Sequence, residues 1–138
     1  MAERATDMTT IPEPEVNPVN APHWEGLKQG KLLYQRCGAC GHAWLPARED
    51  CPNCLSPEND WVEASGRGKL VSWVIYHVPF NKAFAGKLPY NVAVVELDEG
   101  PRAITNIVNP DDGLKADRPV ELVVEEEDGV ALARFRLV

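Results

Sequence analysis

Residues 37–54 read Cys37-Gly-Ala-Cys-Gly-His-Ala-Trp-Leu-Pro-Ala-Arg-Glu-Asp-Cys-Pro-Asn-Cys54. Each Cys-x2-Cys pair places two thiolates on one tight turn, close enough to hold the same ion. A hairpin between the two pairs brings the turns face to face, which gives four sulfur ligands at the tetrahedral distance of about 2.3 Å that zinc prefers. The spacing therefore predicts a structural zinc site whose ligands are Cys37, Cys40, Cys51 and Cys54.

Two alternatives bear on the metal site. The same cysteine turns hold iron in rubredoxins, and thiolates alone do not distinguish iron from zinc. His42 is a further candidate ligand, but four cysteines already complete the coordination shell. A closed shell leaves no position for a reactive water, so we expect the metal to stabilise residues 31–60, which are too few for a core of their own, and not to catalyse a reaction.

The segment before the cysteines divides into an arm and a helix. Residues 1–19 are rich in Pro, Glu and Thr and predict a disordered or extended arm, or one that lies along a partner protein. Residues 20–30 predict a short helix that Asn20 caps and Gly30 ends. Trp24 and Leu27 share one face of this helix, and that face packs either on the protein's own body or on a partner subunit.

From Trp61 onward the pattern is that of β-strands. Five segments rich in β-branched and aromatic residues alternate with turn signals, at residues 69–78, 91–97, 102–108, 119–125 and 130–137. Five strands in residues 61–138 are typical of a small OB-type barrel, although a simple meander would give a similar pattern. The predicted fold is mainly β, with a short N-terminal helix, a rubredoxin-like zinc ribbon at 31–60 and a five-stranded OB-like barrel.

Composition limits the classes of partner. The net charge is −7 and no segment carries a dense basic patch, which argues against nucleic acid because phosphate neutralisation supplies much of that affinity. No apolar run is long enough to span a bilayer, and residues 1–7 lack the apolar core of a secretion signal. We therefore expect a cytoplasmic protein that does not bind membranes and whose cysteines hold metal instead of forming disulfides.

No catalytic motif is present, but one loop is unusual. The sequence contains no nucleophile elbow, phosphate loop or dinucleotide fingerprint, so an independent enzyme is not expected. The segment 78–90 is long for a hairpin loop, and it carries apolar and basic residues together. These residues are Phe80, Lys82, Phe84, Lys87 and Tyr90. They suit a phosphorylated ligand such as coenzyme A, or the loop folds back over the mouth of the barrel.

Several motifs taken together resemble a known family. In order, they are Pro22-His-Trp-Glu-Gly-Leu27, Cys37-x2-Cys40-Gly41, Pro46-x4-Cys51-Pro-x-Cys54, Ser65-Gly-Arg-Gly68, Val71-Ser-Trp73, Pro89-Tyr90 and Val94-Val-Glu-Leu-Asp-Glu-Gly-Pro101. They resemble the zinc-ribbon OB-fold family that accompanies thiolases and acyl-CoA-metabolising enzymes. The resemblance covers residues 20–138 and is specific only when the motifs are combined.

The resemblance implies a function. Members of this family form complexes with thiolase-like enzymes that carry out thiolysis, retro-aldol cleavage or acyl condensation on CoA thioesters, and the partner supplies the catalytic residues. By this resemblance the chain is a non-catalytic accessory subunit that stabilises its partner and helps form the acyl-CoA channel. We therefore predict that the zinc ribbon and the helix, through Trp24 and Leu27, dock the partner. The loop from Phe80 to Tyr90 is predicted to border the channel. The alternative is a single-stranded nucleic-acid-binding module, which the OB fold permits and the charge disfavours.

Overall fold

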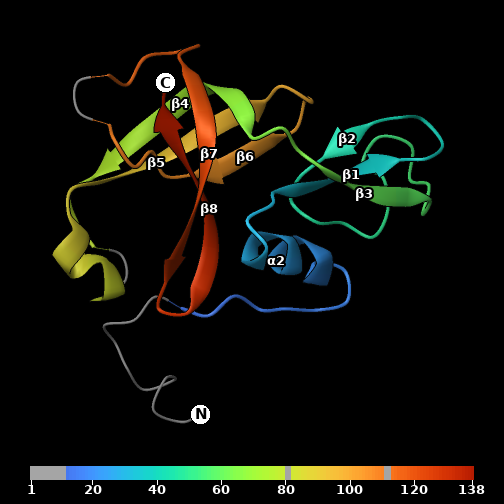
Figure 1. Cartoon of the computed structure of the whole chain (residues 1–138), viewed down its shortest axis with the longest axis horizontal. Coiled ribbons are helices and arrows are strands. Elements are labelled where there is room, and N and C mark those ends of the chain that lie inside the picture. The colour runs from blue at the N-terminus through green and yellow to red at the C-terminus, as the bar shows by residue number, and fades with distance from the viewer. Residues whose placement is uncertain (1–11, 80–81, 111–112) are drawn as a thin grey trace, which may run out of the picture.

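The computed structural model describes residues 12–79, 82–110 and 113–138 (Figure 1). Most of the predicted arm, residues 1–11, lies outside the described residues, as does Phe80. Residues 12–17 form neither helix nor strand and lead into a turn at residues 18–20.

Helix α2 spans Ala21–Lys28, within the predicted range of 20–30. Pro22 lies in its first turn, where a missing N–H costs nothing. The predicted side-chain cap is wrong, because the Asn20 Oδ1 atom accepts a hydrogen bond from the backbone N–H of Asn17. Gly30, at φ 78°, ends the helix and donates its N–H to the carbonyl of Leu27. In the described part of the chain, no helix has the length and apolar character required to cross a bilayer.

The cysteine region forms a three-stranded antiparallel sheet of order β2-β1-β3. Its strands are β1 (Leu33–Cys37), β2 (Ala43–Trp44) and β3 (Asn59–Glu63). Strands β1 and β2 correspond to the predicted hairpin around the first cysteine pair. Strand β3 was not predicted, since Asn59 and Asp60 have low β-propensity, and it runs across the predicted boundary at residue 60.

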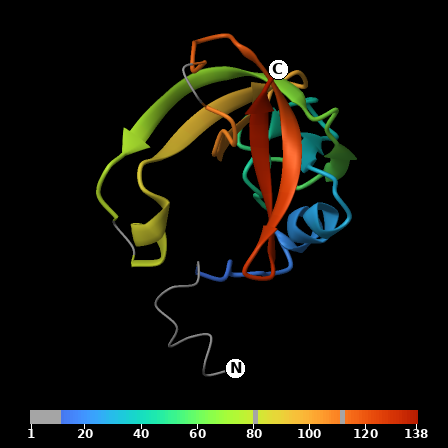
Figure 2. The ribbon, with the colours of Figure 1, turned by 60° about the vertical axis from the view of Figure 1, so that its left-hand side comes forward.

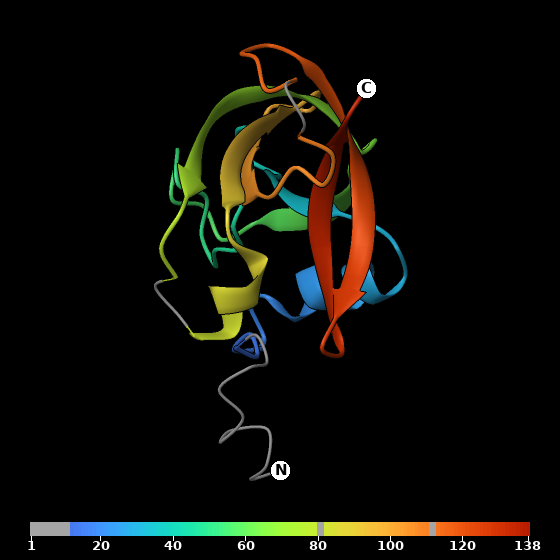
Figure 3. The ribbon, with the colours of Figure 1, turned by 90° about the vertical axis from the view of Figure 1, so that its left-hand side faces the viewer.

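The five-stranded barrel has the order β6-β5-β4-β7-β8, which a meander would not have (Figures 2 and 3). Its strands are β4 (Arg67–Tyr76), β5 (Tyr90–Leu97), β6 (Arg102–Thr105), β7 (Pro119–Glu127) and β8 (Val130–Leu137). A parallel bridge between Ile107 and Phe135 brings the chain after β6 against β8 and nearly closes the barrel. The predicted OB-like fold is thus confirmed, and only β6 is shorter than predicted.

Strand β4 pairs with both of its neighbours at its first residues. Gly68 pairs with β7 and with β5, and it lies so close to β5 that a Cβ atom there would overlap the carbonyl oxygen of Glu96. Between Leu70 and Ser72 the register with β5 shifts by one residue. The pairing with β7 ends at this shift, where the N–H of Leu70 donates to the carbonyl of Arg118, the residue before β7, at 2.9 Å.

Asparagine side chains replace backbone pairing where β6 ends. The side chain of Asn91, which is buried, accepts from the N–H of Ile107 at 2.7 Å and donates to the carbonyl of Ile107 at 2.9 Å. Asn109 accepts from the N–H of Leu137 at 2.7 Å in the same manner. These bonds attach residues 107–109 to β5 and β8 and complete the barrel wall.

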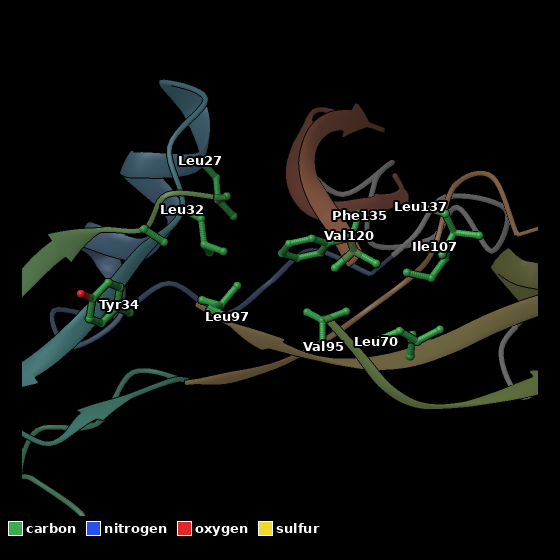
Figure 4. Packing of buried hydrophobic residues seen from close by; sticks show 12 residues of the cluster. Leu27, Leu32, Tyr34, Leu70, Val95, Leu97, Ile107, Val120, Phe135 and Leu137 are labelled. Atoms are coloured by element: carbon green, nitrogen blue, oxygen red, sulfur yellow. The ribbon is translucent and has the colours of Figure 1, made fainter. Parts of the chain in front are cut away.

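One hydrophobic core joins the helix, the ribbon and the barrel (Figure 4). Leu27 of α2, with Leu32 and Tyr34 from the ribbon, packs in the same cluster as Leu97 and Phe135 of the barrel, and each is at most 2% exposed. The ribbon and the barrel therefore share their interior and stabilise each other.

We expect Asn91→Ala to lower the free energy of unfolding by about 1–3 kcal/mol, because the buried N–H and carbonyl of Ile107 would both lose their partner. Urea unfolding of the zinc-loaded protein measures this change. Asn109→Ala is the matched variant and should lower the free energy of unfolding by a smaller amount, since Asn109 is exposed. A loss below about 0.5 kcal/mol for Asn91→Ala would show that water replaces the side chain.

Candidate metal centre and neighbouring surfaces

The four cysteine sulfur atoms lie within 4.8 Å of one another. The Sγ atoms of Cys37 and Cys54 are 3.6 Å apart, as are those of Cys40 and Cys51. Four ligands at about 2.3 Å from a tetrahedral zinc ion would be separated by about 3.8 Å, so this cluster fits zinc with little movement. His42 instead stacks on Trp44, with ring centroids 6.2 Å apart, and does not enter the cluster.

The two cysteine turns have the same hydrogen-bond pattern. The backbone N–H groups of Ala39 and Cys40 donate to the Cys37 sulfur, at 3.3 and 3.4 Å. Those of Asn53 and Cys54 donate to the Cys51 sulfur, both at 3.4 Å. The sulfur atoms that accept these bonds belong to the two buried cysteines of the cluster. Donors aimed at sulfur favour the thiolate form that a metal requires.

Neighbouring groups shift the pKa values of the two exposed thiols, Cys40 and Cys54, in opposite directions. The side-chain amide of Asn53, 3.6 Å from the Cys40 sulfur, is the main cause that lowers the pKa of Cys40 to about 6. The backbone of Ser56 acts to lower the pKa of Cys54, but desolvation and the three other thiols raise it to about 12. Zinc binding must therefore displace the Cys54 proton at neutral pH, and metal affinity falls as the pH falls.

Gln35 organises the ribbon beside the metal site and was missed by the sequence analysis. Its side chain is 3% exposed, and its oxygen accepts from Trp44 Nε1 and from the backbone N–H of Arg48, both at 2.9 Å. Its amide nitrogen donates to the Arg48 carbonyl at 2.8 Å and to Asn59 at 2.9 Å. All of its hydrogen-bonding groups are used, so Gln35 fixes the segment between the two cysteine turns. A glutamine in a strand gives no local signal for this role.

The predicted docking residues of α2 have different surroundings. Leu27 is 2% exposed and belongs to the shared core, so it leaves no side-chain surface for a partner. Trp24 is half-buried and borders a cavity of about 530 Å³ between α2, the ribbon and the barrel. His23 lies against Trp24 with ring centroids 5.0 Å apart, and desolvation lowers the pKa of His23 below its usual value.

The loop between β4 and β5 contains a 3-10 helix, η1 (Lys82–Lys87). Phe80 lies outside the described residues, and the side chain of Phe84 is not described either. Lys82 is exposed, whereas Lys87 forms an ion pair with Glu127 of β7. Tyr90 packs against Tyr76, with ring centroids 5.2 Å apart.

Glu127 connects this loop to the β7–β8 hairpin. Its second carboxylate oxygen lies 2.6 Å from Arg134, which also contacts Glu125 at 2.8 Å. Lys87 first, and Arg134 as well, lower the pKa of the Glu127 carboxyl. The charge of Lys87 is therefore compensated within the chain by Glu127.

Removal of the metal should unfold the ribbon and lower the stability of the barrel, because the two share one core. We expect Cys51→Ala, or treatment with a strong chelator, to expose Trp44, which is 4% exposed in the folded ribbon, and so to shift tryptophan emission to longer wavelength. Zinc content by atomic absorption is measured in parallel. His42→Ala is the control and should retain one zinc per chain. Unchanged fluorescence after complete zinc loss would show that the ribbon folds without metal.

The last residue of each cysteine turn offers a second test. Gly41 (φ 79°) and Leu55 (φ 67°) occupy equivalent left-handed positions, and the Leu55 side chain is 74% exposed. Leu55→Gly should therefore stabilise the zinc-loaded protein by about 0.5–1 kcal/mol, and Gly41→Leu should destabilise it by about 1 kcal/mol. Thermal unfolding measures both changes. Equal stabilities of the two variants would contradict the assignment of backbone strain to Leu55.

Comparison with known proteins places this architecture in a family. The chain matches the model of the ChsH2 rubredoxin-like zinc ribbon domain over residues 24–60 and that of the ChsH2 C-terminal OB-fold domain over residues 61–125. A solved structure described as the Ltp2-ChsH2(DUF35) aldolase is 40% identical, with a TM-score of 0.80, over 91% of this chain and 98% of that chain.

Two curated relatives extend this finding. The probable enoyl-CoA hydratase alpha subunit of Thermomonospora curvata is 42% identical over 91% of this chain, which spans only 39% of that protein. The benzoylsuccinyl-CoA thiolase subunit BbsA of Thauera aromatica is 27% identical over 99% of this chain and 97% of its own length. The predicted family is thus confirmed: the chain belongs to the ChsH2 (DUF35) family, in which a rubredoxin-like zinc ribbon precedes an OB-fold domain.

Proposed function

We propose that this chain is a non-catalytic accessory subunit of a thiolase-like enzyme that acts on a CoA thioester by thiolysis, retro-aldol cleavage or acyl condensation. The observation that carries this proposal is similarity over nearly the full length to a protein named as a thiolase subunit and to a chain of an aldolase structure. The four cysteines of this chain would hold a structural zinc ion in that complex.

The geometry of the chain agrees with a non-catalytic role. The metal cluster uses four protein ligands, which leaves no coordination position for substrate. His42 stacks on Trp44, and His23 meets Trp24 edge-to-face. Among the residues that the structure describes, no hydrogen bond joins a histidine ring to a serine, threonine or cysteine side chain, as nucleophilic catalysis would require. We infer that the partner supplies the catalytic groups.

The nucleic-acid alternative is disfavoured by the surface where OB proteins bind. That surface is the outer face of the second and third barrel strands, which are β5 and β6 in this chain. Here it presents Val92, Val94 and Ile104, whereas single-strand binders combine stacking aromatics with a basic groove. With a net charge of −7, the chain has no excess of cations to compensate for this difference.

We further propose that the loop from residue 78 to residue 90 borders the acyl-CoA channel of the complex. Lys82 supplies an exposed cation there, with Phe80 and Phe84 beside it in sequence. Lys87, through its ion pair with Glu127, would hold this loop against the β7–β8 hairpin.

The test is co-purification of the tagged full chain from native extract, followed by mass spectrometry and a CoA-thioester cleavage assay on the eluate. We expect a stoichiometric thiolase-like protein, and turnover only when both proteins are present. Cleavage by the purified chain alone would instead make it an enzyme. Absence of any thiolase-like protein, together with salt-sensitive binding of oligonucleotides, would support the nucleic-acid module.

A further inference from the structure

The apolar cavity beside Trp24 lies where the helix, the ribbon and the barrel meet. Its volume is about 530 Å³. Its walls come from all three parts of the molecule, and they include Trp24 of α2, Leu45 and Pro46 of the ribbon, and Val94 and Ile104 of the barrel. The only ionisable side chains in its lining are His23 and Arg102.

This cavity continues onto the outer face of the barrel sheet. Alternate residues of β5 are buried, so Val92 and Val94 point outward. Val92 pairs with Val74 of β4, and Val94 pairs with Ile104 of β6, which places four aliphatic side chains side by side on one face. Ile104 is 79% exposed and Val74 52% exposed. We call the cavity and these four residues the apolar face.

The ionisable groups around the apolar face are already engaged. Arg102 lies 3.3 Å from Glu96, which also pairs with Lys69 at 3.6 Å. His23 lies against Trp24 and hydrogen-bonds with the backbone of Leu33, and desolvation lowers its pKa. A small-molecule site needs a few polar groups that fix the orientation of its ligand, and both Arg102 and His23 already have partners within the chain. An aliphatic surface that contains a cavity, and whose flanking charged side chains form ion pairs within the chain, is instead typical of the centre of a protein–protein interface.

We propose that the apolar face is the docking surface for the partner subunit, which would insert a large apolar side chain, such as Leu, Phe or Trp, into the cavity and cover the aliphatic row. This inference rests on the proposed function, in which the chain binds a thiolase-like protein. Ile104 and Val74 would then make the exposed part of the contact, whereas Leu27, which is 2% exposed, contributes only to the lining of the cavity. Because the flanking charges are paired within the chain, association depends little on salt.

The test uses the thiolase-like protein that co-purifies with the tagged chain, isolated and immobilised, and compares variants of the full chain by surface plasmon resonance. Ile104→Glu and Val74→Glu would each bury an unpaired carboxylate in the interface, and we expect each to weaken binding about thirtyfold or more. Both side chains are exposed in the free protein, so zinc content and thermal unfolding should stay unchanged. Val138→Glu, at an exposed aliphatic residue elsewhere (62% exposed), is the matched control.

Three results would overturn the inference. Binding of both Glu variants within threefold of the unaltered chain would place the interface elsewhere while leaving the proposed function intact. An equal loss of binding for Val138→Glu would show that added charge, and not the apolar face, is responsible. If the unaltered chain binds no thiolase-like protein at all, the proposed function fails and this inference fails with it.

Discussion

The rest of the structure depends on the coordination that four converging cysteine sulfurs require. Their thiolate charges repel one another, so they remain within 4.8 Å only if a cation compensates them. The ribbon's own buried cluster is small and consists of Trp44 and two of the metal ligands, Cys37 and Cys51. Metal binding therefore does for the ribbon what a hydrophobic core does for a larger domain. Only a folded ribbon can then present Leu32 and Tyr34 to the core that it shares with the barrel.

Features encoded by neighbouring residues could be predicted from the sequence. The two Cys-x2-Cys turns indicate the metal, because the ligand spacing leaves few other geometries. The turn at Asp128 and Gly129, with φ of 52° and 81°, has the left-handed backbone that its sequence indicates, and the predicted strand 130–137 is found unchanged.

Features that depend on residues far apart in the chain could not be predicted. Lys87 and Glu127 are forty residues apart, and only the barrel topology brings them together. Asn91 reads as one polar residue in an apolar strand, and its role becomes visible only when the backbone of Ile107 lies beside it. Strand β3 forms because β1 offers it a partner, despite its polar first residues. In each of these cases a long-range pairing, and not local propensity, decides the outcome.

The position of the apolar face suggests how the metal affects function without touching a substrate or a partner. Leu45 and Pro46, which wall the cavity, directly follow Trp44, and Gln35 holds both Trp44 and the backbone of Arg48 just beyond them. Gln35 itself precedes Cys37 by two residues in β1. Zinc would thus fix β1, and β1 would fix the segment between the cysteine turns. That segment would complete the wall of the cavity. In this arrangement the ribbon is one wall of the docking surface, and the closed coordination shell is an advantage, because a purely structural metal keeps the wall rigid without adding reactivity.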